Sequence, residues 1–412
     1  MNQASDRRPT GWGDPPVGAP TIDDIRKAAE RLKGVANRTP LVPFGPQISG
    51  IFLKSEVGQP TGSFKIRGAY TRMSRLDGAE RATGVVAASA GNHAQGVALA
   101  AQLLGIEATV FMPQAAALPK VSATRGYGAT VRLEGATLGD ALVHAQEFAT
   151  RTGAVLIHPY DHVDVVAGQG TLGLELLEQC PQVRTVVVCT GGGGLLAGVA
   201  TAMKGHDRSI RVVGAQAATA AAYPPSLAAG TPLTLPHMDT IADGIAVPRP
   251  GDVPFGIVQE LVDDVVVVSD KDISRAQLML LERAKLVVEP AGAAAAAAVL
   301  AEPAAFEPPV VVVMSGGNID PLLLLRVIRY GMAAAGRYLA LSVRIPDTPG
   351  SLARLLTLLG ETDANVVEVE HVRIEPQLRL DEVEVALQLE ARGPVHAAQI
   401  TQRLREAGYT IA

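Results

Sequence analysis

The chain has 412 residues, enough for two or three domains at roughly 100–200 residues each. Lys and Arg number 36 and Asp and Glu number 41, so the formal net charge is −5. This mildly acidic balance argues against a broad surface for nucleic acid or membrane. Apolar residues make up 48% and charged residues 19%, which excludes disorder over the whole chain.

The first twenty residues are rich in Pro, Gly and polar side chains, and we expect them to form a tail without regular structure. No apolar stretch follows the charges of this segment, so it does not have the pattern of a signal peptide. The apolar window 291–300 is too short to span a bilayer. Two cysteines, Cys180 and Cys189, suit a reducing compartment, and we expect a cytoplasmic protein.

Thr21 and Asp24 have the spacing of a capping box, which predicts a helix that ends near Lys33. Short β-branched runs then alternate with helical stretches, a pattern typical of α/β proteins with one or two mostly parallel sheets. Several of the runs are continuously apolar, as strands covered on both faces should be. The expected strands are Ile51–Lys54, Val85–Ala88, Ala108–Met112, Thr130–Glu134, Ala154–His158, Thr185–Cys189, Arg211–Ala215, Val265–Ser269 and Val310–Met314.

The pattern changes near Gly336, where a strand, helix, strand, strand, helix and short strand follow one another. Residues 382–391 alternate between apolar and polar side chains, which indicates a sheet with one face in water. This order predicts a separate α+β domain of ferredoxin-like design. We therefore expect a tail at residues 1–20, a large α/β domain at residues 21–335 and a small domain at residues 336–412.

The segment Thr61–Ala69 places Lys65 in the first turn of an expected helix. The partial positive charge of a helix N-terminus disfavours an ammonium group, so Lys65 should be more nucleophilic than a surface lysine. Such a lysine suits Schiff-base chemistry. The alternative is a solvated lysine at a helix start, beside Arg67.

The turn at residues 88–96 directly follows an expected strand. Ser89 and Asn92 are residue types that cap helices, and Gly91 allows a ligand to approach the backbone closely. Free amides at such a strand end can bind a carboxylate. An ordinary capped turn is the alternative, with His93 as a hydrogen-bonded histidine rather than a base.

Four consecutive glycines, Gly191, Gly192, Gly193 and Gly194, follow an apolar strand and precede Leu195 and a helix. Such a run has a large entropic cost and little packing value, so an ordinary loop explains it poorly. Its amides can hold a phosphate at the helix N-terminus. The spacing matches neither a nucleotide P-loop nor a dinucleotide fingerprint, and it favours a monophosphate ligand.

Ser315 follows the expected strand Val310–Met314 and should project from the carboxyl edge of the sheet, although alone it would be read as a turn serine. The lysine, the carboxylate-binding turn, the glycine run and this serine all fall at strand ends, where open α/β sheets bind ligands. A phosphate-bearing aldehyde that forms a Schiff base satisfies all four features. This combination points to pyridoxal 5'-phosphate.

At these residues the sequence resembles the threonine dehydratase (threonine ammonia-lyase) branch of the fold-type II pyridoxal-phosphate enzymes. The resemblance implies two open, mostly parallel α/β sheets with the site between them, residues 21–335 as the catalytic domain, and one small-molecule amino-acid substrate. The implied reaction converts L-threonine to 2-oxobutanoate and ammonia, with L-serine as a side substrate, in isoleucine biosynthesis or threonine catabolism. Six segments resemble the family's motifs in the family's order: Ser63–Ala69, Ser89–Gly96, Gly191–Gly194, Ile241–Gly244, Glu289–Gly292 and Ser315–Asn318.

The same resemblance implies residue roles. Lys65 would be the catalytic Schiff-base lysine and proton shuttle, Phe64 would pack on the cofactor ring, and Asn92 would bond its phenolic oxygen. Ser315 would face the pyridine nitrogen, where a neutral hydroxyl does not force protonation and so favours elimination over transamination. The phosphate would be held by Gly191, Gly192, Gly193, Gly194 and Leu195, and the substrate by Ser89, Ala90, Gly91, Asn92 and His93.

The small domain carries its own resemblance. The segment Ile345–Leu352 with the surrounding strand and helix order is similar to an ACT domain, an amino-acid-sensing module. Free amides after Gly350 could bind the carboxylate of an effector such as isoleucine or valine. A domain that only mediates oligomerisation is the alternative. In either case we expect a homo-oligomer, a dimer or a tetramer.

Three alternative functions stay open. Serine racemase is one, but the family position that matches Ala90 is commonly a serine that handles a proton, and alanine has none to give. Such relatives hold a divalent cation with carboxylates, which residues 216–222 lack, so we expect no divalent metal site, although backbone carbonyls could still hold a monovalent ion. Cysteine synthases share the fold but resemble the chain less. A non-catalytic amino-acid sensor would require the loss of Lys65 or of the glycine run, and both are present.

Overall fold

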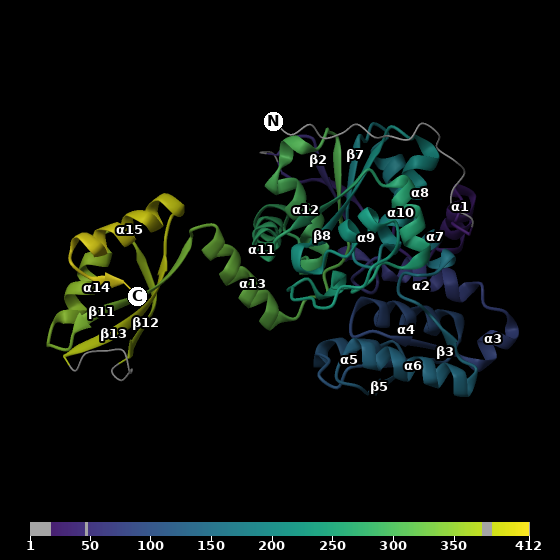
Figure 1. The fold of residues 1–412 in the computed structure, drawn as a ribbon, viewed down its shortest axis with the longest axis horizontal. Helices are drawn as coiled ribbons and strands as arrows, with labels where there is room; N and C mark the ends of the chain where they lie inside the picture. The colour runs from purple at the N-terminus through teal and green to yellow at the C-terminus, as the bar shows by residue number, and fades with distance from the viewer. Residues whose placement is uncertain (1–17, 46–47, 373–380, 412) are drawn as a thin grey trace. The chain divides into compact units, whose positions relative to one another are not determined.

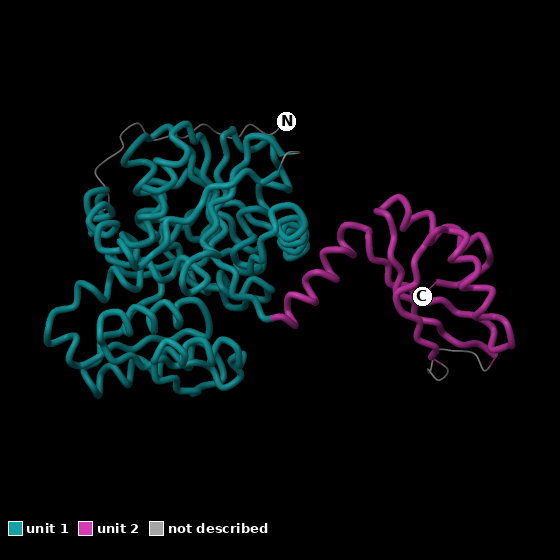
Figure 2. The backbone as a smooth tube through the Cα atoms, turned by 180° about the vertical axis from the view of Figure 1, so that it is seen from behind, with its two compact units in different colours: residues 1–320 teal, residues 321–412 magenta. Residues whose placement is uncertain are grey.

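The computed structural model describes residues 18–45, 48–372 and 381–411, and it forms two compact units, residues 1–320 and 321–412. Figure 1 labels the helices and strands, and Figure 2 shows the two units in different colours. Most of the tail expected at residues 1–20 lies outside the described residues.

The first unit begins with helix α1 (Ile22–Arg31), which confirms the predicted capping box. The backbone N–H of Asp24 donates to Thr21 Oγ1 at 3.2 Å, and the backbone N–H of Thr21 donates to Asp24 Oδ2 at 3.0 Å. These two bonds satisfy N–H groups that the first turn of a helix leaves without a partner.

The first unit contains two sheets, and all nine expected strands are present. In the larger sheet every neighbouring pair is parallel except β1 and β2, and the smaller sheet is entirely parallel. Strand β1, which the sequence analysis missed, has only three residues and contains a proline. The strand order in the larger sheet is β1 (Leu41–Pro43), β2 (Ile51–Ser55), β10 (Val310–Met314), β7 (Thr185–Cys189), β8 (Arg211–Ala217) and β9 (Asp264–Val268). The strand order in the smaller sheet is β5 (Thr130–Leu133), β4 (Ala108–Met112), β3 (Val85–Ala88) and β6 (Val155–Leu156).

Alternate residues of strand β10 face two different apolar cores. Val310 and Val312 pack in one cluster, while Val311 and Val313 pack in the other. A strand that is covered on both faces needs apolar side chains at every position, which explains the continuous valine run.

Among the described residues of the first unit, eleven further helices connect or cover these strands, together with short helical turns. The α-helices are α2 (Lys65–Ser74), α3 (Gly78–Thr83), α4 (Asn92–Leu104), α5 (Leu118–Gly126), α6 (Leu138–Thr152), α7 (Val163–Gln179), α8 (Gly194–His206), α9 (Tyr223–Ala229), α10 (Asp252–Leu261), α11 (Asp270–Met279) and α12 (Pro290–Ala301), and the turns are η1 (Glu56–Gly58), η2 (Ala218–Ala220), η3 (Asp243–Ile245), η4 (Leu280–Ala284) and η5 (Pro303–Ala305).

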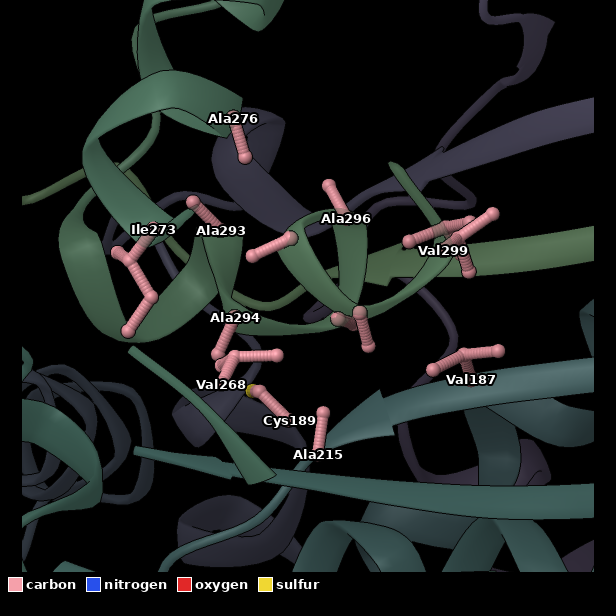
Figure 3. Close-up of a cluster of buried hydrophobic side chains, with 14 of the residues drawn as sticks. Val187, Cys189, Ala215, Val268, Ile273, Ala276, Ala293, Ala294, Ala296 and Val299 are labelled. Atoms are coloured by element: carbon pink, nitrogen blue, oxygen red, sulfur yellow. The ribbon is translucent and has the colours of Figure 1, made fainter. Parts of the chain in front are cut away.

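The alanine-rich window forms helix α12, which is buried in the core of the first unit. Figure 3 shows the methyl group of Ala294 next to Val268, on the side of the helix where Cys189 and Ala215 lie, and that of Ala293 near Ile273. Methyl side chains allow a helix and a sheet to pack closely. Within the described part of the chain, no helix is long and apolar enough to cross a membrane.

The second unit has the predicted element order after an initial helix, α13 (Pro321–Ala334). Its antiparallel sheet has the strand order β12-β13-β11-β14. Buried residues of one sheet face, such as Val385 and Leu387, pack with Leu355 and Leu404 of the helices. The elements are β11 (Tyr338–Pro346), α14 (Ser351–Glu361), β12 (Asn365–Val372), β13 (Glu382–Glu390), α15 (Pro394–Glu406) and β14 (Thr410–Ile411).

Candidate active site

A cavity of about 500 Å³ lies at the carboxyl ends of strands from both sheets of the first unit. Its lining includes the ends of β3 and β7 and Ser315, which directly follows β10. This volume falls in the range of small-molecule sites. The cavity brings together every site residue predicted from the sequence: Phe64, Lys65, Ser89, Ala90, Gly91, Asn92, His93, Gly191, Gly192, Gly193, Gly194, Leu195 and Ser315.

Lys65 is the first residue of helix α2, as predicted. Its Nζ donates a hydrogen bond to the carbonyl oxygen of Pro159 at 2.9 Å and lies 5.1 Å from the centre of the Phe64 ring. Burial lowers the pKa of Lys65 to about 8, against the opposing influence of Cys189 and Glu289. Near physiological pH, the neutral and nucleophilic form of this amine is therefore a minority, but a far larger one than for an exposed lysine.

Arg67, which lies beside Lys65 in sequence, is a buried residue of the same helix. The Arg67 side chain is only 1% exposed and makes two hydrogen bonds to Glu56, from Nε at 2.7 Å and from Nη2 at 2.9 Å. Its Nη1 also donates to Glu175 Oε1 at 2.7 Å. The arginine therefore anchors α2 in the core, two residues after Lys65.

The turn before α4 differs from the expected capped turn. Gly91 is the N-cap residue, and neither Ser89 nor Asn92 caps the helix with its side chain. Instead, the N–H of Gly91 donates to Ser89 Oγ at 3.1 Å, which tightens the turn itself. Asn92 is the first helical residue, and its side chain makes long-range contacts inside the cavity.

His93 is a buried histidine with a backbone partner, the alternative that the sequence analysis set against a base. Its Nε2 lies 2.7 Å from the carbonyl oxygen of Ile157. Burial and the nearby Lys65 lower the pKa of His93 to about 3. The imidazole is therefore neutral at physiological pH, and Nε2 is the nitrogen that donates to this carbonyl.

The glycine run forms a tight turn that larger residues could not adopt. Gly193 has a φ of +98°, and helix α8 begins at Gly194. A Cβ on Gly192 would overlap the Tyr160 ring, and one on Gly191 would lie 3.0 Å from Ile245 Cα. Within the described structure, the N–H groups of residues 191–194 have no protein acceptor. A phosphate group fits this cradle, because it supplies the acceptors that these amides lack.

Ser315 lies next to the thiol of Cys189 at the end of the central strands. The Ser315 side chain is 3% exposed and hydrogen-bonds the Cys189 thiol. Burial raises the pKa of Cys189 to about 11, and the bond to Ser315 only partly opposes this shift. Cys189 is therefore a neutral thiol at physiological pH rather than a reactive thiolate.

Several functional candidates that line the cavity or contact its lining were missed by the sequence analysis. Glu289 and Asn318 belonged to quoted motifs, but only the folded chain shows that both contact Asn92. Lys120 Nζ and Asp243 Oδ2 form an ion pair of 2.8 Å between two lining residues. The sequence did offer one signal for Glu289. This acidic residue stands between an apolar run and an alanine-rich run, where a buried charge needs a partner.

No group of three or more His, Cys, Asp or Glu side chains suited to a metal ion occurs among the described residues. In place of a carboxylate, the end of β8 carries a buried glutamine, Gln216, whose Oε1 accepts a hydrogen bond from the backbone N–H of Tyr223 at 2.9 Å.

Comparison with known proteins decides the family. The pyridoxal-phosphate dependent enzyme family matches residues 32–316. The chain belongs to this family. An L-threonine ammonia-lyase from Thermotoga maritima is 43% identical over 95% of this chain and 98% of its own length. A catabolic L-threonine dehydratase from Escherichia coli K12 is 45% identical over 66% of this chain and 84% of its own length.

Solved structures of pyridoxal-phosphate enzymes agree with this assignment. Threonine deaminase from T.th. has a TM-score of 0.70 and 40% identity, covering 73% of this chain and 99% of that structure. Maize serine racemase has a TM-score of 0.71 and 39% identity, covering 75% of this chain and 96% of that structure. The first unit is thus a fold-type II catalytic fold, and the enzyme depends on pyridoxal 5'-phosphate.

Proposed function

We propose that this enzyme is an L-threonine ammonia-lyase, which converts L-threonine to 2-oxobutanoate and ammonia and acts on L-serine as a side substrate. The observation that carries the proposal is the partly buried Lys65 amine with its lowered pKa, which shares one cavity with the glycine cradle. Two L-threonine ammonia-lyases, from Thermotoga maritima and Geobacter sulfurreducens, match nearly the whole chain at 43% identity.

In this proposal the cofactor is held by residues from both sheets. The amides of the glycine run and Leu195 would hold its phosphate, Phe64 would pack on its ring, and Ser315 would face its pyridine nitrogen. Asn92 would bond its phenolic oxygen, and Lys65 would supply the amine that condenses with its aldehyde, with loss of water. When bound, pyridoxal 5'-phosphate supplies an electron sink that acidifies the α-hydrogen of an amino acid.

The residues of the chain supply binding and proton transfer. The turn of Ser89, Ala90, Gly91, Asn92 and His93 binds the substrate carboxylate through its amides, at the N-terminus of α4. The neutral amine of Lys65, once free, removes the α-proton as a general base. The pKa of His93, near 3, makes this histidine a poor base and leaves that role to the lysine.

Racemisation of serine is the second candidate, because maize serine racemase covers 75% of this chain at 39% identity. Inversion at the α-carbon requires a proton donor on the face opposite Lys65. Ala90, in the carboxylate-binding turn, has no proton to donate. Elimination of the β-hydroxyl needs no such donor, so dehydration is favoured.

The test is 2-oxo acid release by the purified enzyme from L-threonine, L-serine and D-serine, with Lys65→Ala as the inactive variant and Lys33→Ala as a matched surface control. We expect rapid 2-oxobutanoate formation from L-threonine, a rate reduced by several orders of magnitude in Lys65→Ala, and no change in Lys33→Ala. No oxo acid from any substrate would overturn the proposal, and rapid D-serine formation from L-serine would favour racemisation.

For the second unit we propose an ACT regulatory domain formed by residues 336–412, following the catalytic domain of residues 21–335. The support is the strand and helix order of the small antiparallel sheet and the left-handed Gly350, with a φ of +86°, before α14. An amino-acid effector, isoleucine or valine, binds there through its carboxylate. Such regulation favours isoleucine biosynthesis over threonine catabolism as the role of the enzyme.

We also propose a cytoplasmic homo-oligomer, a dimer or a tetramer. The support for a reducing compartment is that Cys180 and Cys189 are both buried and unpaired. Closed symmetric assemblies are the usual form of soluble oligomers. Light scattering coupled to size-exclusion chromatography distinguishes dimer, tetramer and monomer.

A further inference from the structure

Three side chains and one backbone carbonyl form a directed series of hydrogen bonds that includes two residues of the cavity lining, Asn92 and Glu289. Asn318 Nδ2 donates to the carbonyl oxygen of Thr61 at 2.7 Å and to Asn92 Oδ1 at 2.7 Å. Asn92 Nδ2 in turn donates to Glu289 Oε1 at 2.6 Å. These groups come from separate parts of the sequence, so only the folded chain brings them together.

The donor and acceptor direction of these hydrogen bonds follows from the backbone carbonyl of Thr61. A backbone carbonyl can only accept, so the atom of Asn318 that faces it must be the amide nitrogen. The same nitrogen faces Asn92, which must therefore present its oxygen to Asn318 and its nitrogen to Glu289. The amide nitrogen of Asn92 carries two hydrogens, and the bond to Glu289 uses one of them.

Two glycines lie close to the side chains of this hydrogen-bond series. A Cβ on Gly62, whose φ is +69°, would overlap the Asn318 amide. A Cβ on Gly316 would lie 2.5 Å from Glu289 Oε1 and 3.2 Å from Asn92 Nδ2. Only glycine at these two positions leaves room for the hydrogen-bonded side chains.

Glu289 is a carboxylate with little contact with water. It is 4% exposed and precedes helix α12, and its backbone N–H donates to the Gly316 carbonyl at 3.1 Å. The groups that face it are Asp243 from η3, Lys120 from α5, Lys65 and Asn92 from α2 and α4, and the Cys189 thiol at the end of β7. Burial, followed by Asp243, raises the pKa of Glu289 to about 7, against the bond from Asn92.

We propose that Glu289 and Asn318 are positioning residues that fix the Asn92 amide, with its second N–H directed at the phenolic oxygen of the cofactor. The inference rests on the cofactor contact of Asn92 in the proposed function. It deepens that function, because a loss or gain of the Glu289 proton changes the charge on a group that is linked to the cofactor through two hydrogen bonds, one on each side of the Asn92 amide. The absorption of the bound cofactor then depends on the protonation of Glu289.

The experiment compares Glu289→Gln, Glu289→Ala and Asn318→Ala with the wild-type holoenzyme. Glutamine keeps an oxygen acceptor for Asn92 but cannot titrate, whereas alanine removes the acceptor. Gln277→Ala is the matched control, because its Nε2 bonds the carbonyl of the neighbouring Val288 at 2.8 Å without reaching Asn92. The readouts are unfolding of the apoprotein, cofactor affinity by absorbance titration, and the cofactor spectrum as a function of pH.

We expect the wild-type spectrum to titrate near pH 7. Glu289→Ala and Asn318→Ala should shift the absorption band and weaken cofactor binding about tenfold, the scale of a lost hydrogen bond to a charged group. Glu289→Gln should restore the affinity but abolish the titration near pH 7, and Gln277→Ala should keep both.

Two outcomes overturn the proposal. One is a Glu289→Ala or Asn318→Ala holoenzyme with a wild-type spectrum and wild-type cofactor affinity. The other is a Glu289→Gln spectrum that still titrates near pH 7. If the apoprotein of an alanine variant does not fold, the Glu289→Gln titration alone decides. Because these readouts need no substrate, failure of the proposed reaction would show separately, as a wild-type holoenzyme that makes no 2-oxobutanoate.

Discussion

Lys65 and Glu289 are two ionisable side chains of one cavity, and the pKa of each is shifted in the direction that favours its uncharged form. The pKa of Lys65 is lowered to about 8 and that of Glu289 is raised to about 7. Burial is the largest cause of both shifts, since it disfavours the charged form of an amine and of a carboxyl group alike. The sequence argument assigned the reactivity of Lys65 to the helix N-terminus alone. The larger effect comes from the surrounding fold.

The pKa of Lys65 predicts how fast the apoprotein takes up pyridoxal 5'-phosphate. Only the neutral amine attacks an aldehyde, so the uptake rate should rise with pH, about tenfold per unit well below the pKa, and level off above about pH 8. Stopped-flow absorbance from about pH 6 to about pH 10 measures this rate. A rate that keeps rising steeply beyond pH 9 would mean that the amine has the pKa of an ordinary exposed lysine.

Helix α2 is held at its first turns by a buried network of charges. Arg67 bonds Glu56 and Glu175, and Lys54 Nζ bonds Glu175 Oε2 at 2.5 Å. Two cations and two carboxylates balance in this network, which satisfies the condition for charges away from water. The network therefore fixes the helix that carries Lys65.

Removing one partner from this network should destabilise the enzyme strongly. For Glu56→Ala we expect a loss of about 3–5 kcal/mol in the free energy of unfolding, because Arg67 would lose its bidentate partner in the core. Glu178→Ala breaks the exposed pair of Arg38 and Glu178 and should cost less than about 1 kcal/mol. Urea denaturation of both variants measures the difference, and equal midpoints would contradict a stabilising role for the buried network.

The glycine turn before α8 gives a second prediction at this scale. Gly192→Ala should weaken cofactor binding about tenfold, because overpacking against the Tyr160 ring costs about 1–3 kcal/mol and distorts the cradle. Gly126→Ala, at the end of α5 where a Cβ would meet no atom within 4 Å, should bind the cofactor as the wild type does. Equilibrium titration of each apoprotein with pyridoxal 5'-phosphate decides, and a Gly192→Ala variant of full affinity would exclude this cradle.

At the scale of the whole molecule, the two compact units have separate cores. A change confined to the second unit can therefore leave the cavity of the first unit intact, since no member of the small core lines that cavity.

We expect L-isoleucine or L-valine to raise the melting temperature of the full-length enzyme and to change its rate with L-threonine. Gly350→Asp should remove both responses and keep the rate without effector, because a carboxylate before α14 repels the carboxylate of the effector. Gly360→Asp, in the same helix but where a Cβ meets no atom within 4 Å, is the matched control. Absence of any response in the wild type would leave oligomerisation as the role of the second unit.

Much of the fold followed from local sequence patterns. The β-branched runs gave all nine expected strands of the first unit, and the capping box gave the start of α1. The glycine run and Lys65 were found at helix starts because backbone conformation and helix termini depend on a few neighbouring residues. The three-residue strand β1 was missed because its pairing with β2, rather than its own composition, makes it a strand.

The sequence by itself determined the elements, the family motifs and the order of the residues that line the cavity. The tertiary structure alone decided which of these side chains interact. Arg67 is buried because Glu56 and Glu175 reach it, and Asn92 is fixed by Glu289, which lies 197 residues away along the chain. Burial and long-range hydrogen bonds also set the pKa values of Lys65 and Glu289, because both effects arise from residues that are distant in sequence and adjacent only after folding.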